Sequence, residues 1–178
     1  MRKLKVTELK RIDVRQFKAS DKTPLTVVLD DVRSMYNVGS VFRTADSFRL
    51  EKIMLCGITA CPPHPEIHKT ALGAELSIEW KKCENTIEAV NKLHEEGYEV
   101  YALEQVEHSV PLQNFKVEHG KKYALILGNE VKGVSQEAVN ICDGAIEIPQ
   151  FGTKHSMNVS VSGGIAIWQI ASQLLKLQ

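Results

Sequence analysis

Two patterns of apolar residues alternate along this chain. Short β-branched runs are typical of buried strands, and stretches with apolar residues three or four positions apart are typical of amphipathic helices. The runs predict strands over residues 25–30, 53–56, 98–103, 123–127 and 145–148. The spaced patterns predict helices over residues 37–48, 86–96, 135–141 and 158–177.

This alternation, without the turn signals of hairpins, indicates an α/β domain with a mainly parallel sheet and helices on both faces. Asn37 is the predicted N-cap of the first helix, and Gly97 follows the second. The last helix is apolar on more than one face. We therefore expect it to pack against the sheet on one side and against a second subunit on the other.

The composition is that of one ordinary globular domain, with 178 residues, of which 43% are apolar and 25% are charged. The charges balance overall, which argues against binding nucleic acid through net charge alone. They are unevenly placed, however, because residues 1–18 hold seven Lys or Arg and only two Asp or Glu. We expect a basic N-terminal arm, residues 1–24, followed by a single domain, residues 25–178.

Other classes of protein find little support in the sequence. No run approaches the roughly 20 apolar residues of a membrane span, and the start lacks the apolar core of a signal peptide, so we expect a cytoplasmic protein. The four cysteines lack CxxC spacing and are expected to be reduced. Cys61, His64 and His68 have ligand-like spacing but no fourth partner nearby, and we expect no metal.

Ligands of parallel α/β sheets bind beyond the carboxyl ends of the strands, so the loops after strands are the candidates for a site. The first such stretch holds Asn37, Gly39 and Arg43. Its pattern fits a ligand site, but spacing alone favours a helix cap with a surface arginine. Six helical residues place the side chains of Asn37 and Arg43 about two-thirds of a turn apart, so they converge only if the helix start lies in the site.

The second stretch, residues 127–135, has the glycine spacing of a phosphate-binding loop, but Val134 stands where the lysine should be. A nucleoside triphosphatase is therefore disfavoured. Glu130 follows a buried strand, where a carboxylate needs a hydrogen-bond donor or an arginine, unless the turn is solvated.

In the third stretch, residues 148–164, polar side chains interrupt an otherwise apolar helix. The pair Gly163-Gly164 costs about 1 kcal/mol of helix stability per glycine. The pattern fits either a ligand or another backbone at close range, or an elaborate helix cap. His155 lies beside Ser156, but the motif of a serine hydrolase is absent, as is the glycine motif of a dinucleotide site.

Together the three stretches resemble the signature motifs of the SpoU (TrmH-type) RNA ribose 2′-O-methyltransferases of the SPOUT superfamily. Residues Asn37-x-Gly39-x-x-x-Arg43-Thr44-Ala45-Asp46 resemble the first motif, and Leu127-Gly128-Asn129-Glu130-x-x-Gly133-Val134 the second. Residues 148–161, with Ser156-Met157-Asn158, resemble the third, and residues 69–74 resemble a segment between the first two. The resemblance runs from about residue 25 to about residue 175.

The resemblance implies a deep trefoil knot in the C-terminal half, S-adenosylmethionine bound in the knotted loops, and a homodimer. It also implies that Arg43 reaches the site of the partner subunit. The implied cofactor contacts are Leu103, Glu104, Gly128, Asn129, Ile148 and Met157. The implied catalytic residues are Asn37, Arg43, Glu130, Ser156 and Asn158.

The implied reaction transfers a methyl group to a ribose 2′-hydroxyl of tRNA or rRNA. That hydroxyl is a weak acid, so a base or preorganised donors must assist the loss of its proton. A guanidinium rarely gives up its proton, so Arg43 acts either as the base proposed for the family or as a clamp on a neighbouring phosphate. The alternatives are a non-catalytic RNA-binding module with the same fold, which the intact polar set disfavours, and a small-molecule methyltransferase, which leaves the basic arm unexplained.

Overall fold

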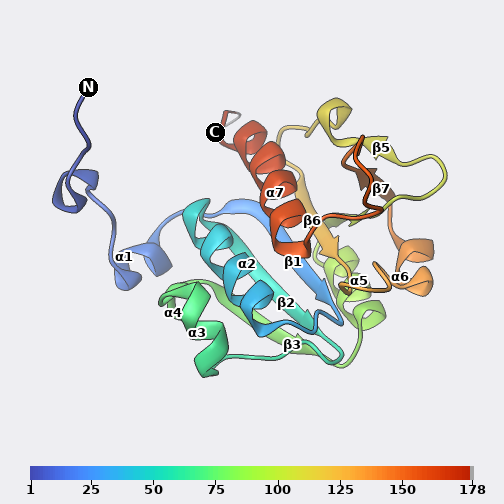
Figure 1. Cartoon of the computed structure of the whole chain (residues 1–178), viewed down its shortest axis with the longest axis horizontal. Coiled ribbons are helices and arrows are strands. Elements are labelled where there is room, and N and C mark those ends of the chain that lie inside the picture. Colours follow the sequence, from blue (N-terminus) through green and yellow to red (C-terminus); the bar gives the residue numbers. More distant parts are fainter. Residues whose placement is uncertain (177–178) are drawn as a thin grey trace.

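A parallel sheet of seven strands forms the centre of the molecule, with the order β3-β2-β1-β6-β4-β7-β5 (Figure 1). The computed structural model describes residues 1–176. Every strand pair in the sheet is parallel, as the alternating pattern predicts. The strands are β1 (Thr23–Asp30), β2 (Leu50–Cys56), β3 (Glu79–Cys83), β4 (Tyr98–Leu103), β5 (Val110–Pro111), β6 (Lys122–Leu127) and β7 (Gly144–Glu147).

Helices cover both faces of this sheet, which confirms the predicted α/β class. Each of the four predicted helices agrees with a helix of the structure to within about two positions at each end. Leu177, the predicted end of the last helix, lies outside the described residues. The helices are η1 (Val6–Leu9), α1 (Val14–Ala19), α2 (Met35–Ser47), α3 (Pro65–Ala71), α4 (Ala74–Ser77), α5 (Thr86–Glu95), η2 (Leu112–Asn114), α6 (Gln136–Ile141) and α7 (Val159–Lys176).

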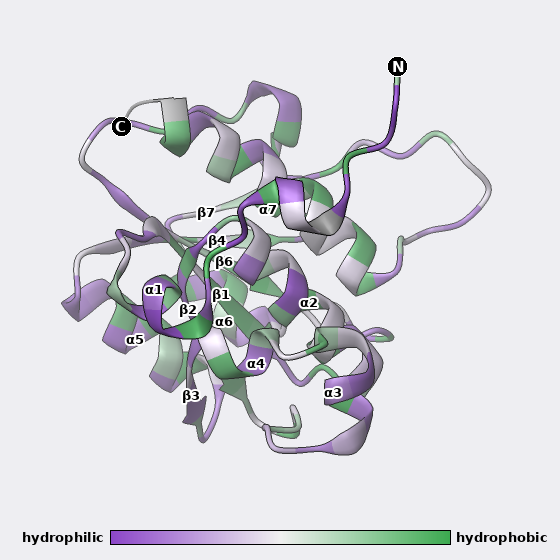
Figure 2. Cartoon of the chain, turned by 90° about the vertical axis from the view of Figure 1, so that its left-hand side faces the viewer, coloured by the Kyte–Doolittle hydropathy of each residue, from purple (hydrophilic) through white to green (hydrophobic). Residues whose placement is uncertain are grey.

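Strand β1 shows how the sequence builds two hydrophobic layers, because successive side chains of a strand point to opposite faces. Leu25, Val27 and Leu29 belong to a core cluster that includes α2 and α7. Val28, between them, belongs to the second cluster, with α5 and α6. Figure 1 shows α2 and α7 in front of the sheet and α5 behind it. Hydrophilic and hydrophobic residues alternate along these covering helices (Figure 2).

The start of α2 corrects one prediction. The helix begins at Met35, and its N-cap is Ser34, whose hydroxyl accepts a hydrogen bond from the backbone N–H of Asn37 at 3.4 Å. Asn37 is therefore not the N-cap. The local pattern allowed both residues, since serine and asparagine cap helices about equally well.

The sequence pattern also missed several short elements. Strand β3 has a mostly polar sequence, and four of its five residues are not fully buried, so it lacks the apolar run of a central strand. Helix α3 follows the proline-rich loop, where His64 acts as the N-cap by accepting a hydrogen bond from the N–H of Glu66. Within residues 1–176, no helix is long and apolar enough to cross a bilayer.

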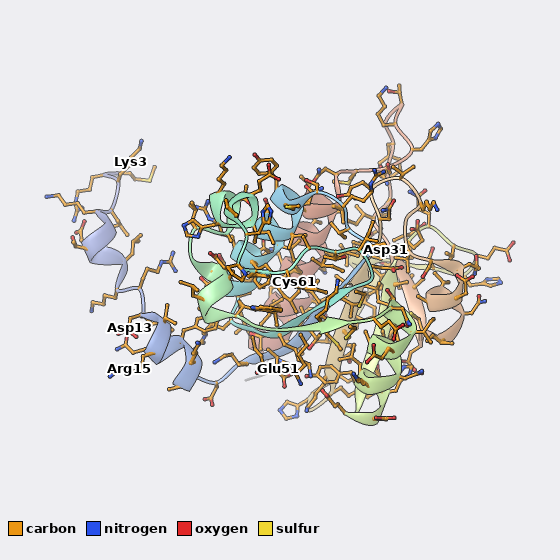
Figure 3. All side chains as sticks on the ribbon, turned by 90° about the horizontal axis from the view of Figure 1, so that it is seen from below. Lys3, Asp13, Arg15, Asp31, Glu51 and Cys61 are labelled. Atoms are coloured by element: carbon orange, nitrogen blue, oxygen red, sulfur yellow. The ribbon has the colours of Figure 1, made fainter. Side chains whose placement is uncertain are left out.

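The N-terminal arm projects from the body of the molecule, and Lys3, Asp13 and Arg15 lie along it (Figure 3). Its contact with the body is through α1, where Phe17 is buried in the core cluster that contains α2 and α7. Asp13 caps α1 by accepting a hydrogen bond from the N–H of Gln16 at 2.8 Å. The basic segment before α1 is therefore exposed, while α1 itself is anchored.

Helix α7 is buried on one side only within this chain. Its inner side packs into the core cluster through Ala166, Ile167, Ile170 and Leu174. Apolar residues also line its outer side, spaced three, four or seven positions apart, with 37% to 55% of their surface exposed. These residues are Val161, Ile165, Trp168 and Leu175. We call them the outer stripe of α7.

Candidate active site

A cavity of about 320 Å³ lies at the carboxyl ends of β4, β6 and β7. This is the end of a parallel sheet at which ligands bind. Among its lining residues are Glu130 and Ser156. It is also lined by every residue that the sequence resemblance implies as a cofactor contact, namely Leu103, Glu104, Gly128, Asn129, Ile148 and Met157. The structure thus brings together segments that are far apart in the chain.

The loop after β6 folds back on itself at the edge of this cavity. The backbone groups of Asn129 and Gly133 exchange two hydrogen bonds, of 3.0 and 2.9 Å. A Cβ atom at Gly128 would lie only 2.1 Å from the backbone carbon of Gly133, so no side chain fits there. Glu104 holds the loop from β4, because its carboxylate accepts a hydrogen bond from the N–H of Val134 at 2.9 Å. The cavity therefore has a wall of closely packed backbone.

Glu130 lines the cavity and joins this loop to the start of α2. One carboxylate oxygen accepts hydrogen bonds from the N–H of Ser34 at 2.9 Å and from the side-chain amide of Asn37 at 3.0 Å. The other oxygen accepts from the N–H of Arg33 at 2.9 Å. Partial burial raises the pKa of Glu130, but these hydrogen bonds outweigh burial and lower the pKa below its usual value. Glu130 is thus a fixed carboxylate with its oxygens engaged, and the solvated turn is excluded.

Asn37 connects Glu130 to the third motif. Its side-chain oxygen accepts a hydrogen bond from the amide of Asn158 at 3.2 Å. Asn158 in turn caps α7, because its own side-chain oxygen accepts from the N–H of Ser160 at 2.9 Å and from the hydroxyl of Ser160 at 2.7 Å. The sequence left a cap and a ligand site open as alternatives for this segment. The structure shows that Asn158 caps the helix and also belongs to the network at the cavity.

Ser156 lies in the exposed loop that leads into α7 and lines the cavity. This loop is tied to the segment after β4, because the side-chain amide of Gln105 donates a hydrogen bond to the carbonyl of His155 at 3.1 Å. Met157, the next cavity residue, is half-buried. The loop therefore contributes two residues, Ser156 and Met157, to the lining of the cavity.

Arg43 is not part of this cavity. It lies on the exposed side of α2, in a separate depression of about 420 Å³ that is also lined by Ser40, Thr44, Ser47, Lys69 and Thr70. Of the residues proposed as catalytic, the structure brings together Asn37, Glu130, Ser156 and Asn158, and it leaves Arg43 apart. This separation agrees with the geometry of α2, in which Asn37 and Arg43 point about two-thirds of a turn apart.

Sequence reasoning missed some residues that shape the site. Arg33 and Ser34 act through backbone N–H groups, which leave no signal in side-chain chemistry. Asp30, at the end of β1, accepts hydrogen bonds from both the N–H and the hydroxyl of Ser135, at 2.8 and 2.9 Å, and from Thr86. The sequence did offer one signal for Asp30, because a carboxylate at the end of an apolar strand needs hydrogen-bond donors. Asp30 ties the start of α6 to the end of β1.

The fold and the cavity define the chain as a parallel α/β domain with a cavity at the carboxyl ends of its strands. Residues 24–168 match the sequence model of the SpoU rRNA Methylase family. Because this match covers most of the chain, the chain belongs to the SpoU rRNA Methylase family.

Two relatives illustrate the match. The chain is 29% identical to the tRNA (guanosine(18)-2′-O)-methyltransferase of Thermus thermophilus over 170 residues, which is 96% of this chain and 86% of that protein. It is 27% identical to the 23S rRNA (guanosine-2′-O-)-methyltransferase RlmB of Vibrio parahaemolyticus over 169 residues, 94% of this chain and 67% of that protein.

Solved structures agree in fold. The TrmH/SpoU tRNA modifying enzyme of A. aeolicus superimposes with a TM-score of 0.79 at 24% identity, over 92% of this chain and 83% of that one. The AdoMet-bound rRNA methyltransferase of Sinorhizobium meliloti superimposes with a TM-score of 0.78 at 26% identity, over 88% of this chain and 59% of that one.

Proposed function

We propose that this chain is an S-adenosylmethionine-dependent methyltransferase that modifies a ribose 2′-hydroxyl of tRNA or rRNA. The observation that carries the proposal is the hydrogen-bonded connection from Glu130, which lines the cavity, through Asn37 to Asn158. It joins one residue of each signature motif. The names of the relatives, which act on ribose 2′-hydroxyls of tRNA and rRNA, support the same conclusion.

The chemistry of the cavity fits S-adenosylmethionine, which carries two positive charges, one carboxylate and a nucleoside. Its walls combine apolar side chains, such as Leu103 and Ile148, with the half-buried backbone around Gly128. Three carboxylates, Glu104, Glu130 and Glu147, also line it. We propose that Leu103, Glu104, Gly128, Asn129, Ile148 and Met157 hold the cofactor.

The bound cofactor supplies an electrophilic methyl group on its sulfonium. The chain must then orient the ribose hydroxyl and stabilise the charge that develops on its oxygen as the proton leaves. Glu130 is poorly suited as the base, because its oxygens are engaged by N–H groups and its pKa is lowered. We assign Glu130 and Asn37 to positioning the start of α2, Asn158 to fixing the start of α7, and Ser156 to contact with the ribose.

Arg43 completes the proposed site from a partner subunit. Within one chain it faces a different depression from the cavity, so a second copy offers a way to bring the two together. The outer stripe of α7 is an apolar face that such a dimer would bury. A guanidinium stays protonated at neutral pH, so we assign Arg43 to binding the phosphate beside the reacting hydroxyl rather than to accepting the proton.

Two further proposals concern the chain's organisation. We infer that the C-terminal half forms the trefoil knot of the family. In support, the side chain of Gln173, on α7, bonds to the backbone of Phe115 and Val117, in the segment between β4 and β6. We also infer that the N-terminal arm binds RNA, since the segment before α1 is basic and exposed. The arm is shorter than the predicted residues 1–24, because Phe17 is buried in the core and Thr23 and Pro24 belong to β1.

Replacement of Arg43 tests the proposed function directly. Arg43→Ala should abolish methyl transfer to RNA while leaving the affinity for S-adenosylmethionine, measured by calorimetry, within a few-fold of the wild type. Arg49→Ala is the matched control, because Arg49 is exposed just after the C-cap of the same helix but does not line the depression. Equal losses of transfer and cofactor affinity in Arg43→Ala would contradict the assignment.

A further inference from the structure

Tyr36 presents an exposed aromatic ring beside the proposed site. It precedes Asn37 in the first turn of α2, and 45% of its surface is exposed. Its backbone is held firmly, because its carbonyl accepts hydrogen bonds from the hydroxyl of Ser40 at 2.8 Å and from that of Thr70 at 2.9 Å. The second bond ties α2 to α3. Tyr36 thus has a fixed backbone and a solvent-exposed ring, and it directly precedes Asn37 of the catalytic network.

One cation lies close to this ring, and it shares a depression with a second. The ammonium of Lys69, on α3, is 6.0 Å from the centroid of the Tyr36 ring. Lys69 also lines the same depression as Arg43. Neither Lys69 nor Arg43 has a salt-bridge partner among the described residues. The depression therefore carries two uncompensated positive charges.

The polar groups around these cations add no opposing charge. The hydroxyls of Ser40, Thr44 and Ser47 donate to backbone carbonyls of α2, so their protons are not available to a ligand. Recognition at this surface therefore depends on the two cations and on the ring. That combination is the one proteins use for single-stranded RNA, in which bases stack on aromatic rings and phosphates contact Lys or Arg.

We propose that Tyr36 and Lys69 bind a nucleotide of the substrate RNA next to the methylated one, with the Tyr36 ring stacked on its base and Lys69 on its phosphate. This inference rests on the proposed function and extends it to a contact outside the catalytic motifs. The surface is continuous with the catalytic network through the peptide between Tyr36 and Asn37 and with Arg43 through the shared depression. A protein partner with an apolar face fits less well, because both cations would lose water without gaining a partner.

Substitutions at Tyr36 separate stacking from other roles. Stacking on an aromatic ring is worth about 1 to 3 kcal/mol per base, so Tyr36→Leu should weaken binding of the methylatable RNA by roughly 5-fold to 150-fold. Tyr36→Phe keeps the ring and should bind within about two-fold of the wild type. Binding is measured by fluorescence anisotropy of the labelled RNA, and calorimetry should show unchanged affinity for S-adenosylmethionine in both variants.

The charge of Lys69 is tested by salt dependence. Lys69→Ala should make the slope of log affinity against log salt shallower by about 0.7 to 1, as expected for one lost phosphate contact. Lys116→Ala is the matched control. Lys116 is also exposed and without a salt-bridge partner among the described residues, but it lies between η2 and β6, at the opposite end of the sheet. The slope of log affinity against log salt for Lys116→Ala should equal that of the wild type.

Several results would overturn the inference. Unchanged RNA affinity in Tyr36→Leu would exclude stacking, and equal losses in Tyr36→Leu and Tyr36→Phe would assign the effect to the hydroxyl. A change of sedimentation coefficient in Tyr36→Leu would make the surface a contact between copies of the chain. Failure of the proposed function can be distinguished from failure of this inference. In that case the wild-type protein would bind S-adenosylmethionine or RNA without methyl transfer.

Discussion

Glu130 shows how one carboxylate organises the site at the scale of single residues. Its oxygens accept hydrogen bonds from Arg33, Ser34 and Asn37, all of which precede it by more than ninety positions in the chain. Charge-assisted hydrogen bonds of this kind are stronger than neutral ones. Removing the carboxylate should therefore loosen the start of α2 and the loop after β6 together.

The free energy of unfolding should report this role as a function of pH. Glu130→Gln should lower it by about 1 to 3 kcal/mol near neutral pH, because an amide cannot accept all three hydrogen bonds. The folded pKa of Glu130 lies below the unfolded value of about 4.5, so its stabilising contribution is present above that pH and is lost as the pH falls through the folded pKa. The wild type and the variant should therefore converge in stability under more acidic conditions.

Denaturant titration at fixed protein concentration, from neutral pH to about pH 3, measures this difference. Glu107→Gln is the control, since Glu107 is exposed and accepts no hydrogen bond among the described residues, and it should leave the free energy of unfolding within about 0.5 kcal/mol. A difference between wild type and Glu130→Gln that stays constant over this range would show that the charge of Glu130 contributes nothing.

The side chains that meet at the cavity were predictable from the sequence only in part. Asn37, Glu130 and Asn158 carry chemistry that spacing alone left ambiguous, and the resemblance to a family singled them out. The way they meet was beyond prediction, because the partners of Glu130 include two backbone N–H groups. The depression around Arg43 was also missed, since Lys69 comes from α3, a helix that the sequence pattern did not reveal.

At the scale of elements, α7 explains a feature of the sequence that local propensity disfavours. The adjacent glycines Gly163 and Gly164 lie inside a helix, where each costs about 1 kcal/mol. A Cβ atom at Gly163 would lie 2.6 Å from Cδ1 of Leu127, the last residue of β6, whereas one at Gly164 would meet no atom of the described residues within 4 Å. Gly163 therefore permits the close packing of α7 on the end of β6.

This difference gives a matched pair of substitutions. Gly163→Ala should lower the free energy of unfolding by about 1 to 3 kcal/mol, because Leu127 is buried and has little space to move. Gly164→Ala should leave it unchanged or raise it by up to about 1 kcal/mol, because alanine favours the helix. Thermal unfolding of the two variants measures the contrast. If Gly163→Ala is as stable as Gly164→Ala, the proposed packing of α7 on β6 is wrong.

Elements with a regular apolar pattern were predictable from the sequence, whereas short or mostly polar elements were not. The strands β1, β2, β4, β6 and β7 have apolar runs that agree closely with the structure, because both faces of the sheet are covered. Strand β3 lies at the edge and is mostly polar, so it carried no such signal. The short helices α3 and α4 are formed by caps and by packing against α2, which sequence periodicity does not report.

At the scale of the whole molecule, the outer stripe of α7 is an apolar surface that the rest of the chain leaves exposed. Trp168 packs against Phe48 with ring centroids 5.3 Å apart, yet 55% of its surface is exposed. Contiguous apolar surface of this kind marks interaction sites. We propose that the partner is a second copy of this chain, which would also bring Arg43 to the cavity of its neighbour.

Trp168→Glu should therefore produce a monomer that remains folded. The substitution places a charge in the centre of the proposed interface, where it would lose water without a partner, but in a single chain the position is solvent-accessible. Sedimentation at micromolar concentration should show a dimer for the wild type and a monomer for the variant, with unchanged circular dichroism. A wild-type monomer would contradict both the dimer and the site shared between subunits.

The central claim is that this chain transfers a methyl group to a ribose hydroxyl, and the chemical identity of the product tests it most directly. Purified protein is incubated with methyl-labelled S-adenosylmethionine and unmodified tRNA and rRNA, and the RNA is then digested to nucleosides. The account predicts label in a 2′-O-methylated nucleoside and none after incubation with Arg43→Ala. Label in a base-methylated nucleoside, or no label in RNA while S-adenosylmethionine binds, would contradict it.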